Sequence, residues 1–581
     1  MKTKIVGIFV CTLLIATAVP SVTGSLKEIK NVSMLQYKQS NMGKIGEINF
    51  DKTDLLIISH EDFLNELKAL QVHKNNTGVK TIIKSWQSLD NEYSGMGRDL
   101  QERIKVAISD YKQNYDIKYV MLVGDCDKCP VRYIKALTTE WGIKYYPSDL
   151  YYADLYDNYG NFDDWDGGDP PYGGNGYFGE MDFHGFSEHD LSKLNLDKID
   201  GYPDVAVGRI PASTVQEVTT YVNKVISYEI NALLSDWFNR ALWVVDNAFG
   251  APPKKDRLDI YLPNHYITKA YNAPGWNTWT RDQRAQYIND MINEGLGFVN
   301  YFGHGNRFTW AGIYDQYPPY NDMAYLTNSD MLPVIFAVSC YTGRFHFDLD
   351  YYQDVDGNEW NGGTGERPEP MAVQPSMYDR ESLSEEFLVK RNTGAVAYIG
   401  CTSKNEYGGE DLDKYFFEAY YMGSPIGYMW NYALKEWMDN VDLCGNYAFI
   451  HMHKVMLFGD PSLRVGGRIP LELSITAAPG NFGIKALLRN NGDFTITEVS
   501  CGFSIRKALM ILGRYKQVAP NPPGPIPPTV EAVAKTGLIF GFGPAEITFE
   551  TRFQIEDSEF EVEKKATGLI IGPFVFNVKE I

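Results

Sequence analysis

A histidine and a cysteine stand at the ends of two apolar runs, and together these residue types could perform thiol chemistry. The run Phe298–Phe302 leads into Gly303-His304-Gly305, and the run Leu332–Ser339 leads into Cys340. A cysteine thiolate with a neighbouring histidine as base is the minimum equipment for nucleophilic acyl transfer. The histidine would accept the thiol proton and later donate it to a leaving amine. The two segments therefore predict a thiol-dependent acyl-transfer site at His304 and Cys340.

The elements that must position these residues are two buried strands. Both runs are rich in β-branched or aromatic residues and stop at turn residues. In open α/β sheets the carboxyl ends of the strands form the ligand-binding edge, so both side chains would reach one edge. The backbone N–H groups of Gly305 and Cys340 are candidates for binding a developing oxyanion. The glycines around His304 would permit close backbone approach and unusual dihedral angles. Taken singly, the Gly-His-Gly turn and a small buried thiol at Cys340 are the alternatives.

Strand-like and helix-like segments alternate through most of the chain, which predicts an α/β fold with a parallel sheet and helices on both faces. One βα series occupies residues 51–235, and a second, in residues 236–466, carries the predicted chemistry. Helical spacing is strongest at Arg98–Tyr115 and Val215–Asn231. Residues 470–581 show alternating apolar patterns and an Asn491-Gly492 hairpin signal, which predict an all-β sandwich domain.

Composition narrows the class of protein. The chain has 581 residues and a formal net charge of −20, which disfavours nucleic acid as a partner. Residues 1–24 have the basic start, short apolar core and small residues of a secretory signal peptide, with an uncleaved anchor as the alternative. Residues 25–50 would be a linker or a short pro-segment. No other run of 18 apolar residues occurs, so we expect no membrane span after signal removal and a secreted, extracellular or cell-surface location.

Two acidic segments suggest calcium. Between Tyr145 and Ser192 there are eleven Asp and Glu residues and no Lys or Arg. Carboxylates without basic partners either stay solvated or bind hard cations. A second segment has the oxygen-ligand spacing of a calcium loop but lacks the closing Glu of an EF-hand. We therefore predict structural calcium, and no cofactor for catalysis. The candidate ligands are Asp163, Asp166, Asp350, Asp354, Asp356 and Asn358.

Several motifs in the same order resemble the gingipain family of cysteine peptidases, which share a caspase-like α/β fold. The resemblance covers roughly residues 50 to 465 and depends on more than the two reactive residues. It implies a caspase-like parallel-sheet domain in two βα halves, followed by an immunoglobulin-like C-terminal domain. It also implies a secreted cysteine endopeptidase with His304 and Cys340 as its catalytic dyad. The matching stretches are Tyr119–Asp125, Val207–Arg209, Tyr228–Glu229, Gly297–Gly305, Leu326–Ser329, Leu332–Phe336, Cys340 and Leu457–Ser462.

The resemblance also suggests further site residues. The family often has an acid that faces the histidine, and we assign it to Asp246, although an ungapped alignment falls on Ala248. A strand-end Asp that caps the next turn is the alternative for Asp246. Family members that cleave after basic residues carry an acid in the primary pocket, here Asp259, and Tyr407 falls at an aromatic pocket wall. The alternative for Asp259 is a solvated acid in the first turn of a helix.

Three functions compete. The first is a secreted endopeptidase that acts on proteins or peptides, with a preference for Lys or Arg before the scissile bond as a hypothesis. The second is a sortase-like transpeptidase on the same fold, which would transfer the acyl group to an amine. The third is a non-catalytic surface or adhesion protein. The histidine and cysteine with their flanking glycines favour an enzyme.

Overall fold

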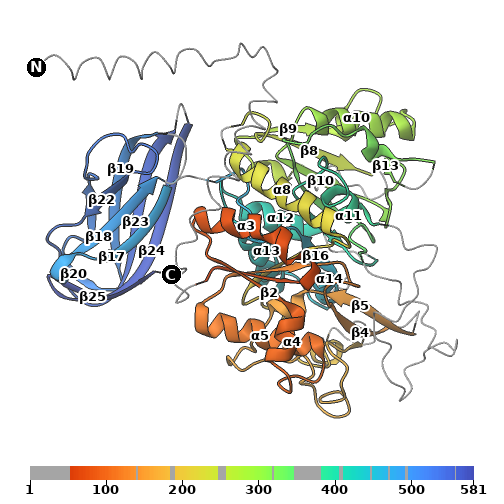
Figure 1. Ribbon diagram of the computed structural model, residues 1–581, viewed down its shortest axis with the longest axis horizontal. Coiled ribbons are helices and arrows are strands. Elements are labelled where there is room, and N and C mark those ends of the chain that lie inside the picture. The colour runs from red at the N-terminus through yellow and green to blue at the C-terminus, as the bar shows by residue number, and fades with distance from the viewer. Residues whose placement is uncertain are drawn as a thin grey trace, which may run out of the picture. The chain divides into compact units, whose positions relative to one another are not determined.

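The structure, a computed structural model, describes most of the chain from Thr53 onward (Figure 1). Phe50–Ile581 forms one compact unit, and the predicted signal peptide and linker lie outside the described residues. Two apolar cores occur in this unit, one within residues 55–465 and the other built almost entirely from residues 471–575. The described residues are 53–138, 142–182, 190–233, 235–246, 257–316, 319–345, 381–404, 410–444, 448–468, 471–490, 495–555 and 558–580.

A ten-stranded sheet forms the centre of the α/β part. Among its described strands, β15 and β16 are the only antiparallel neighbours, and all other neighbouring pairs are parallel. Parallel strands covered by helices are buried on both faces, which explains their continuous apolar runs. In spatial order the strands are β2 (Thr81–Ser85), β1 (Leu55–Ser59), β3 (Tyr119–Val123), β7 (Ala206–Ile210), β16 (Val455–Phe458), β15 (Ala397–Cys401), β14 (Val334–Val338), β10 (Phe298–Phe302), β8 (Arg240–Val245) and β9 (Tyr266–Lys269).

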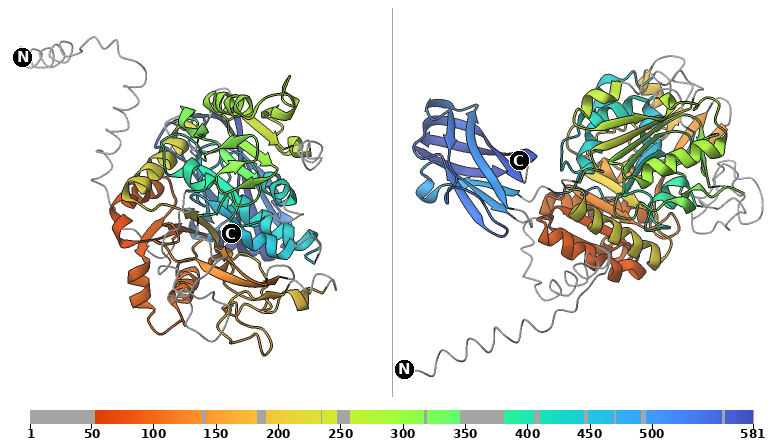
Figure 2. Two further views of the ribbon diagram at one scale, coloured as in Figure 1. Left: turned by 90° about the vertical axis from the view of Figure 1, so that its right-hand side faces the viewer. Right: turned by 90° about the horizontal axis from the view of Figure 1, so that it is seen from above.

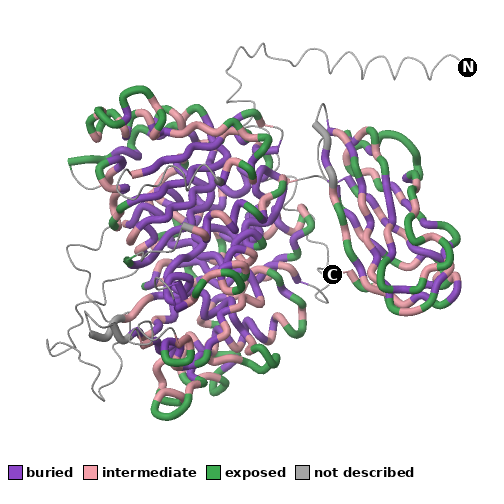
Figure 3. The backbone as a smooth tube through the Cα atoms, turned by 180° about the vertical axis from the view of Figure 1, so that it is seen from behind, coloured by how far each residue is buried: buried purple, intermediate pink, exposed green. Residues whose placement is uncertain are grey.

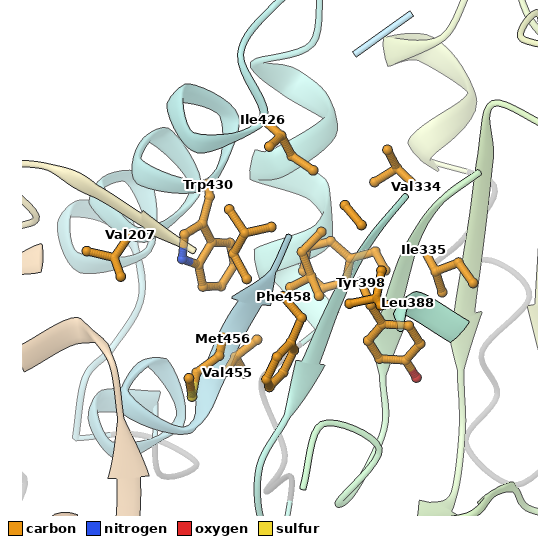
Figure 4. Close-up of a cluster of buried hydrophobic side chains, with 14 of the residues drawn as sticks. Val207, Val334, Ile335, Leu388, Tyr398, Ile426, Trp430, Val455, Met456 and Phe458 are labelled. Carbon is orange, nitrogen blue, oxygen red and sulfur yellow. The ribbon is translucent and has the colours of Figure 1, made fainter. Parts of the chain in front are cut away.

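Helices lie on both sides of this sheet (Figure 2). The ring of Phe336 in β14 lies 5.4 Å from that of Phe416 in α12, while Tyr398 in β15 stacks on Phe387 of α11 at 6.0 Å. Figure 4 shows side chains of β7, β14, β15 and β16 meeting those of α11 and α13 in one continuous core. The main helices are α3 (Leu64–Asn76), α4 (Trp86–Glu92), α5 (Leu100–Tyr115), α8 (Val215–Asn231), α10 (Arg281–Asn293), α11 (Leu383–Leu388), α12 (Glu410–Glu418), α13 (Ile426–Asn440) and α14 (Ala448–Lys454).

Buried ion pairs account for several of the motif residues. Lys74 of α3 lies 2.7 Å from both Glu229 of α8 and Asp460, just after β16. His73 contacts the same Glu229 carboxylate at 2.7 Å, and all four side chains are almost fully buried. Burial would raise the pKa of Glu229, but the Lys74 ammonium and the hydrogen bonds with His73 and Lys74 hold it below its usual value. These motif residues therefore connect α3, α8 and β16 and have no need of a catalytic role.

Between β3 and β7 the chain contains an insertion with a small three-stranded sheet of its own. Its strands are β5 (Gly142–Ser148), β4 (Arg132–Thr138) and β6 (Met181–Asp182). Its carboxylates find donors in the backbone and in cations from outside the acidic stretch. Arg98 pairs with Asp164 and Asp166, and Lys135 with Glu180. The insertion is thus an ordered, internally bonded structure over its described residues.

The C-terminal residues form two sheets that share the second core. One sheet contains β17 (Leu471–Ala477), β18 (Ile484–Asn490) and β22 (Glu531–Lys535). Figure 3 shows how buried and exposed positions alternate along these strands, as in sheets with one solvated face. The predicted Asn491-Gly492 hairpin is wrong, because β18 and β19 on either side of it belong to different sheets. The second sheet contains β21 (Tyr515–Val518), β19 (Ile496–Arg506), β23 (Phe540–Ile555), β24 (Ser558–Gly572) and β25 (Phe574–Glu580), and β20 (Leu509–Leu512) pairs with β23.

Candidate active site

His304 and Cys340 follow the ends of two neighbouring parallel strands. The register of β10 and β14 pairs Phe302 with Val338, the last residue of each strand. His304 and Cys340 both come two residues after that pair, so the strands deliver them to the same height at the same edge. His304 is exposed and Cys340 is partly exposed. The predicted juxtaposition of imidazole and thiol at one sheet edge thus agrees with the register of the strands.

The two glycines around His304 make room for neighbouring side chains. A Cβ atom on Gly303 would lie 2.4 Å from Cβ of Asp246, and one on Gly305 would lie 2.1 Å from Oγ of Ser339. The Gly305 position would also be 3.1 Å from the carbonyl oxygen of Cys340, so the histidine loop lies directly against the cysteine turn. Neither glycine has a positive φ. The glycines therefore allow the histidine loop to pack closely against its neighbours without a positive φ. The expected close approach of this backbone to a substrate stays a prediction.

The amide of Gly305 lies outside the hydrogen-bonding ladder of its hairpin. Gly305 in β11 (Gly305–Asn306) pairs with Trp310 in β12 (Thr309–Trp310). The flanking bond runs from Ala311 N–H to the His304 carbonyl at 3.0 Å, which marks the pair as a non-hydrogen-bonded one. The ladder to β12 therefore does not consume the Gly305 N–H, as an oxyanion donor requires.

Asp246 lies beside His304 and accepts a hydrogen bond from its backbone. It follows β8, and its N–H donates to the Phe302 carbonyl at 2.9 Å. The N–H of His304 donates to Oδ2 of Asp246 at 3.4 Å. Asp246 thus joins the end of β8 to the loop that carries the histidine.

Tyr301 supports the same loop from inside the sheet, a role that the sequence pattern does not indicate. Its hydroxyl donates to the carbonyl oxygen of His304 at 2.5 Å, and its ring stacks on Trp310 at 4.7 Å. Burial, together with the nearby Asp246, raises the pKa of Tyr301 well above its ordinary value. The phenol therefore stays protonated and remains a hydrogen-bond donor. Its partner, three residues ahead at a turn, could not be inferred from an apolar strand pattern.

The turn after Cys340 is held from two sides. Tyr341 has a φ of 59°, in the left-handed region that non-glycine residues rarely adopt. Its N–H donates to the carbonyl of Ser403, just beyond β15, at 2.8 Å. The N–H of Ser384 in α11 donates to the carbonyl of Thr342 at 3.1 Å. Such enforced backbone conformations are frequent at active sites, because neighbouring structure must over-determine them.

A second cysteine, Cys401, also lies at the end of a strand of the large sheet, but it differs from Cys340 in exposure. Cys401 ends β15 on the neighbouring strand and is fully buried. Its carbonyl accepts the N–H of Gly343 at 3.0 Å, so it helps to fix the turn after Cys340. A substrate carbonyl can reach a nucleophile only where the sulfur is accessible. Burial therefore favours Cys340 over Cys401 as the nucleophile.

Of the two predicted specificity residues, Asp259 and Tyr407, the structure describes Asp259. Asp259 lies in η4 (Arg257–Tyr261), where the indole N–H of Trp243 donates to it at 2.9 Å. Lys269 of β9 lies 2.7 Å from the other carboxylate oxygen. Asp259 is therefore an ion-paired, partly exposed acid in the first turn of η4, and its role in a specificity pocket stays a prediction. Tyr407 lies outside the described residues.

The predicted calcium ligands fall in two groups. Asp166 accepts hydrogen bonds from Arg98 and from the N–H of Gly176, and Asp163 accepts the N–H of Trp165 at 2.9 Å. Within the part of the chain that the structure describes, no group of three or more His, Cys, Asp or Glu side chains has a metal-binding arrangement. Calcium at Asp163 and Asp166 stays a prediction without support from these contacts. Asp350, Asp354, Asp356 and Asn358 lie outside the described residues.

Comparison with known proteins identifies relatives. The model of peptidase family C25 matches residues 48–466. Gingipain R2 of Porphyromonas gingivalis is 22% identical over 450 residues, which are 74% of this chain and 48% of that protein. Lys-gingipain of the same organism is 26% identical over 234 residues, which are 38% of this chain and 11% of that protein. The chain thus spans about half the length of the first relative and far less of the second.

Solved structures are among the matches, at low sequence identity. A complex of the pro- and mature domains of RgpB from Porphyromonas gingivalis is 17% identical, with a TM-score of 0.49, and the match covers 88% of this chain and 99% of that one. A structure described as a protease is 16% identical with a TM-score of 0.50, over 88% of this chain and 96% of that one. At these identities the second likeness concerns the fold alone. That fold is mixed α/β with a large, mostly parallel sheet, as the alternating pattern predicted.

Proposed function

Since this chain belongs to peptidase family C25, we propose that it is a cysteine endopeptidase that hydrolyses peptide bonds through Cys340 and His304. The observation that carries the proposal is the register of β10 and β14, which brings the exposed histidine and the accessible cysteine to one edge. The contact of Gly305 with the Cys340 turn supports the same pairing. The proposal includes a caspase-like fold for the two βα series and an immunoglobulin-like fold for residues 470–581.

The proposed reaction proceeds in two steps. The Cys340 thiolate forms a bond to the carbonyl carbon of the scissile peptide, and the C–N bond breaks as His304 gives a proton to the leaving amine. Water, deprotonated by His304, then attacks the thioester, which releases the acid product and restores the thiol. The N–H groups of Gly305 and Cys340 would stabilise the oxyanion in both steps. Asp246 and Tyr301 would act as positioning residues, because each forms a hydrogen bond with the backbone of His304.

A preference for Arg or Lys before the scissile bond is part of the proposal, with Asp259 as its acid. Asp259 already pairs with Lys269 at 2.7 Å, so a substrate cation would have to share or displace that lysine. A peptide panel with Asp259→Asn tests this point. Loss of basic-residue cleavage with retained cleavage elsewhere would support Asp259, and an unchanged preference would reject it.

We also propose a secreted or cell-surface location, supported by the signal-peptide pattern of residues 1–24. Among the described residues, none of the helices combines the length and the apolar character that a membrane span requires. Structural calcium remains a proposal, and the ligand spacing of the Asp350–Asn358 segment supports it.

The decisive test compares Cys340→Ala with Cys401→Ala on fluorogenic peptides and on a protein substrate. We expect the first variant to lose hydrolysis and the second to retain it. Hydrolysis that survives in Cys340→Ala would reject the proposed nucleophile. Product analysis with an added amine identifies the reaction type, since amide products in place of acid would make the enzyme a transpeptidase. Absence of any reaction in the wild type would favour the adhesion alternative.

A further inference from the structure

The C-terminal domain exposes a continuous row of large apolar side chains. Leu509 of β20 pairs with Phe542 of β23, Phe542 with Ile571 of β24, and Ile571 with Phe574 of β25. Directly paired residues project from the same face of a sheet and lie close together. All four are exposed, and Leu509 is 67% accessible. The row therefore forms one stripe across four strands on the solvent face of the larger sheet.

The stripe is not required by the core of the domain. Residues on the opposite face of the same strands, including Ile547, Ile570 and Val575, are fully buried in the second core. The remaining part of β20 adds Ile511 and Leu512, which are 68% and 45% exposed. We name the surface of Leu509, Ile511, Leu512, Phe542, Ile571 and Phe574 the apolar end of the domain. Figure 1 shows β20 and β25 together at this end. An exposed patch of this extent usually marks an interaction site.

Basic residues border the apolar end. Residues 499–530 contain four Lys and Arg residues and no Asp or Glu, although the whole chain has a net charge of −20. Arg506, Lys507 and Arg514 are exposed on either side of β20. Lys507 pairs with Glu546, while Arg506 and Arg514 add positive charge. An apolar centre with a cationic border complements the negatively charged headgroups and the acyl chains of an anionic lipid surface.

We propose that the apolar end docks on an anionic lipid bilayer as a peripheral contact. Leu509, Ile511 and Phe542 enter the headgroup–acyl boundary, and Arg506 and Arg514 contact lipid phosphates. A second copy of the chain fits less well, because a symmetric contact would bring the same arginines face to face. The proposal is independent of the peptidase activity, since it uses none of the residues of the candidate active site.

Co-sedimentation of the full chain with lipid vesicles tests the proposal. We expect binding to vesicles of phosphatidylcholine and phosphatidylglycerol in equal parts, weaker binding to pure phosphatidylcholine, and weakening by salt. Ile511→Glu should lower the bound fraction about tenfold, because a charge replaces a side chain that would enter the membrane. Arg514→Gln should reduce binding to the anionic vesicles selectively. The matched control is Ile230→Glu on the exposed surface of α8, which should bind like the wild type.

Three results would overturn the proposal. They are no binding to anionic vesicles, equal binding of Ile511→Glu and the wild type, and a wild-type dimer in sedimentation velocity that Ile511→Glu converts to monomers. The last would show that a second copy covers the apolar end. Melting temperatures close to the wild type would confirm that the variants fold, as expected for substitutions at exposed positions.

Discussion

The hydroxyl of Tyr301 donates a hydrogen bond of 2.5 Å to the carbonyl oxygen of His304. Tyr301 is the fourth residue of β10 and is fully buried, whereas His304 is exposed in the loop after that strand. The bond therefore ties the backbone of the proposed base to the rigid interior of the sheet. Stacking of Tyr301 on Trp310 fixes the ring from the other side. A catalytic group gains from such support, because small displacements from the productive geometry slow the reaction.

Tyr301→Phe removes this bond and keeps the aromatic packing. We expect kcat to fall about 3- to 10-fold with little change in KM, since one neutral hydrogen bond contributes about 1 kcal/mol. Tyr314→Phe is the matched control, because its equally buried hydroxyl donates to Asn289 of α10 at 2.8 Å and not to the His304 carbonyl. Steady-state kinetics and melting temperatures would be measured for both. An equal loss of kcat in the two variants would assign Tyr301 a general structural role.

Gly305→Ala should disable the site through crowding. Its Cβ would lie 2.1 Å from Oγ of Ser339, so the histidine loop or the cysteine turn must move. We expect a loss of kcat/KM of about a hundredfold or more, because both reacting groups depend on that contact. Adding Ser339→Ala removes the clashing oxygen and should restore part of the activity. Gly568→Ala in β24, where the nearest atom is 3.4 Å away, serves as the control. Failure of the second substitution to restore any activity would contradict this packing argument.

His453 should make the fold sensitive to acid. It is fully buried in α14 against Trp165 and Phe449, and burial lowers its pKa to about 3. In the unfolded chain a histidine titrates near about 6.5, so between these values the unfolded state binds one more proton at this site. The contribution of neutral His453 to stability is fully present above about pH 6.5, the ordinary histidine value, and is lost progressively as the pH falls below it.

The variant His453→Phe should flatten this dependence by about 1.4 kcal/mol per pH unit over that range. The free energy of unfolding of this variant and of the wild type would be measured from about pH 4 to about pH 7. Met452→Leu, also buried in α14, is the control, because it changes packing without a titratable group. A slope in His453→Phe that equals the wild-type slope would show that other groups dominate the acid response.

Much of the α/β part could be predicted from periodicity. The helix predicted at Val215–Asn231 is α8 with the same bounds, and the strands before His304 and Cys340 are β10 and β14. These elements depend on local patterns of apolar residues, which the sequence displays directly. The order of the strands in space depends on contacts between distant segments. The same is true of the position of β16, which is parallel to β7 and antiparallel to β15.

The residues around the candidate site were harder to predict for the same reason. His304 and Cys340 stand at strand ends, where residue type and position signal chemistry. The bond from Tyr301 to the His304 carbonyl, and the space that Ser339 requires beside Gly305, involve a turn and a neighbouring strand. The hairpin expected at Asn491-Gly492 failed similarly, because a local turn signal does not reveal which sheet each flanking strand joins.

The central claim is that His304 activates Cys340 as a nucleophile, and the pH dependence of Cys340 alkylation tests it most directly. Iodoacetamide reacts with thiolates, and mass spectrometry of peptides would report modification at Cys340 and Cys401 separately. An ordinary thiol titrates near about 8.5 and reacts slowly at neutral pH. We predict that Cys340 reacts with iodoacetamide at about pH 6, within the ordinary titration range of histidine. We also predict that His304→Ala slows this reaction about tenfold or more. Equal rates with and without His304, or preferential modification of the buried Cys401, would contradict the account.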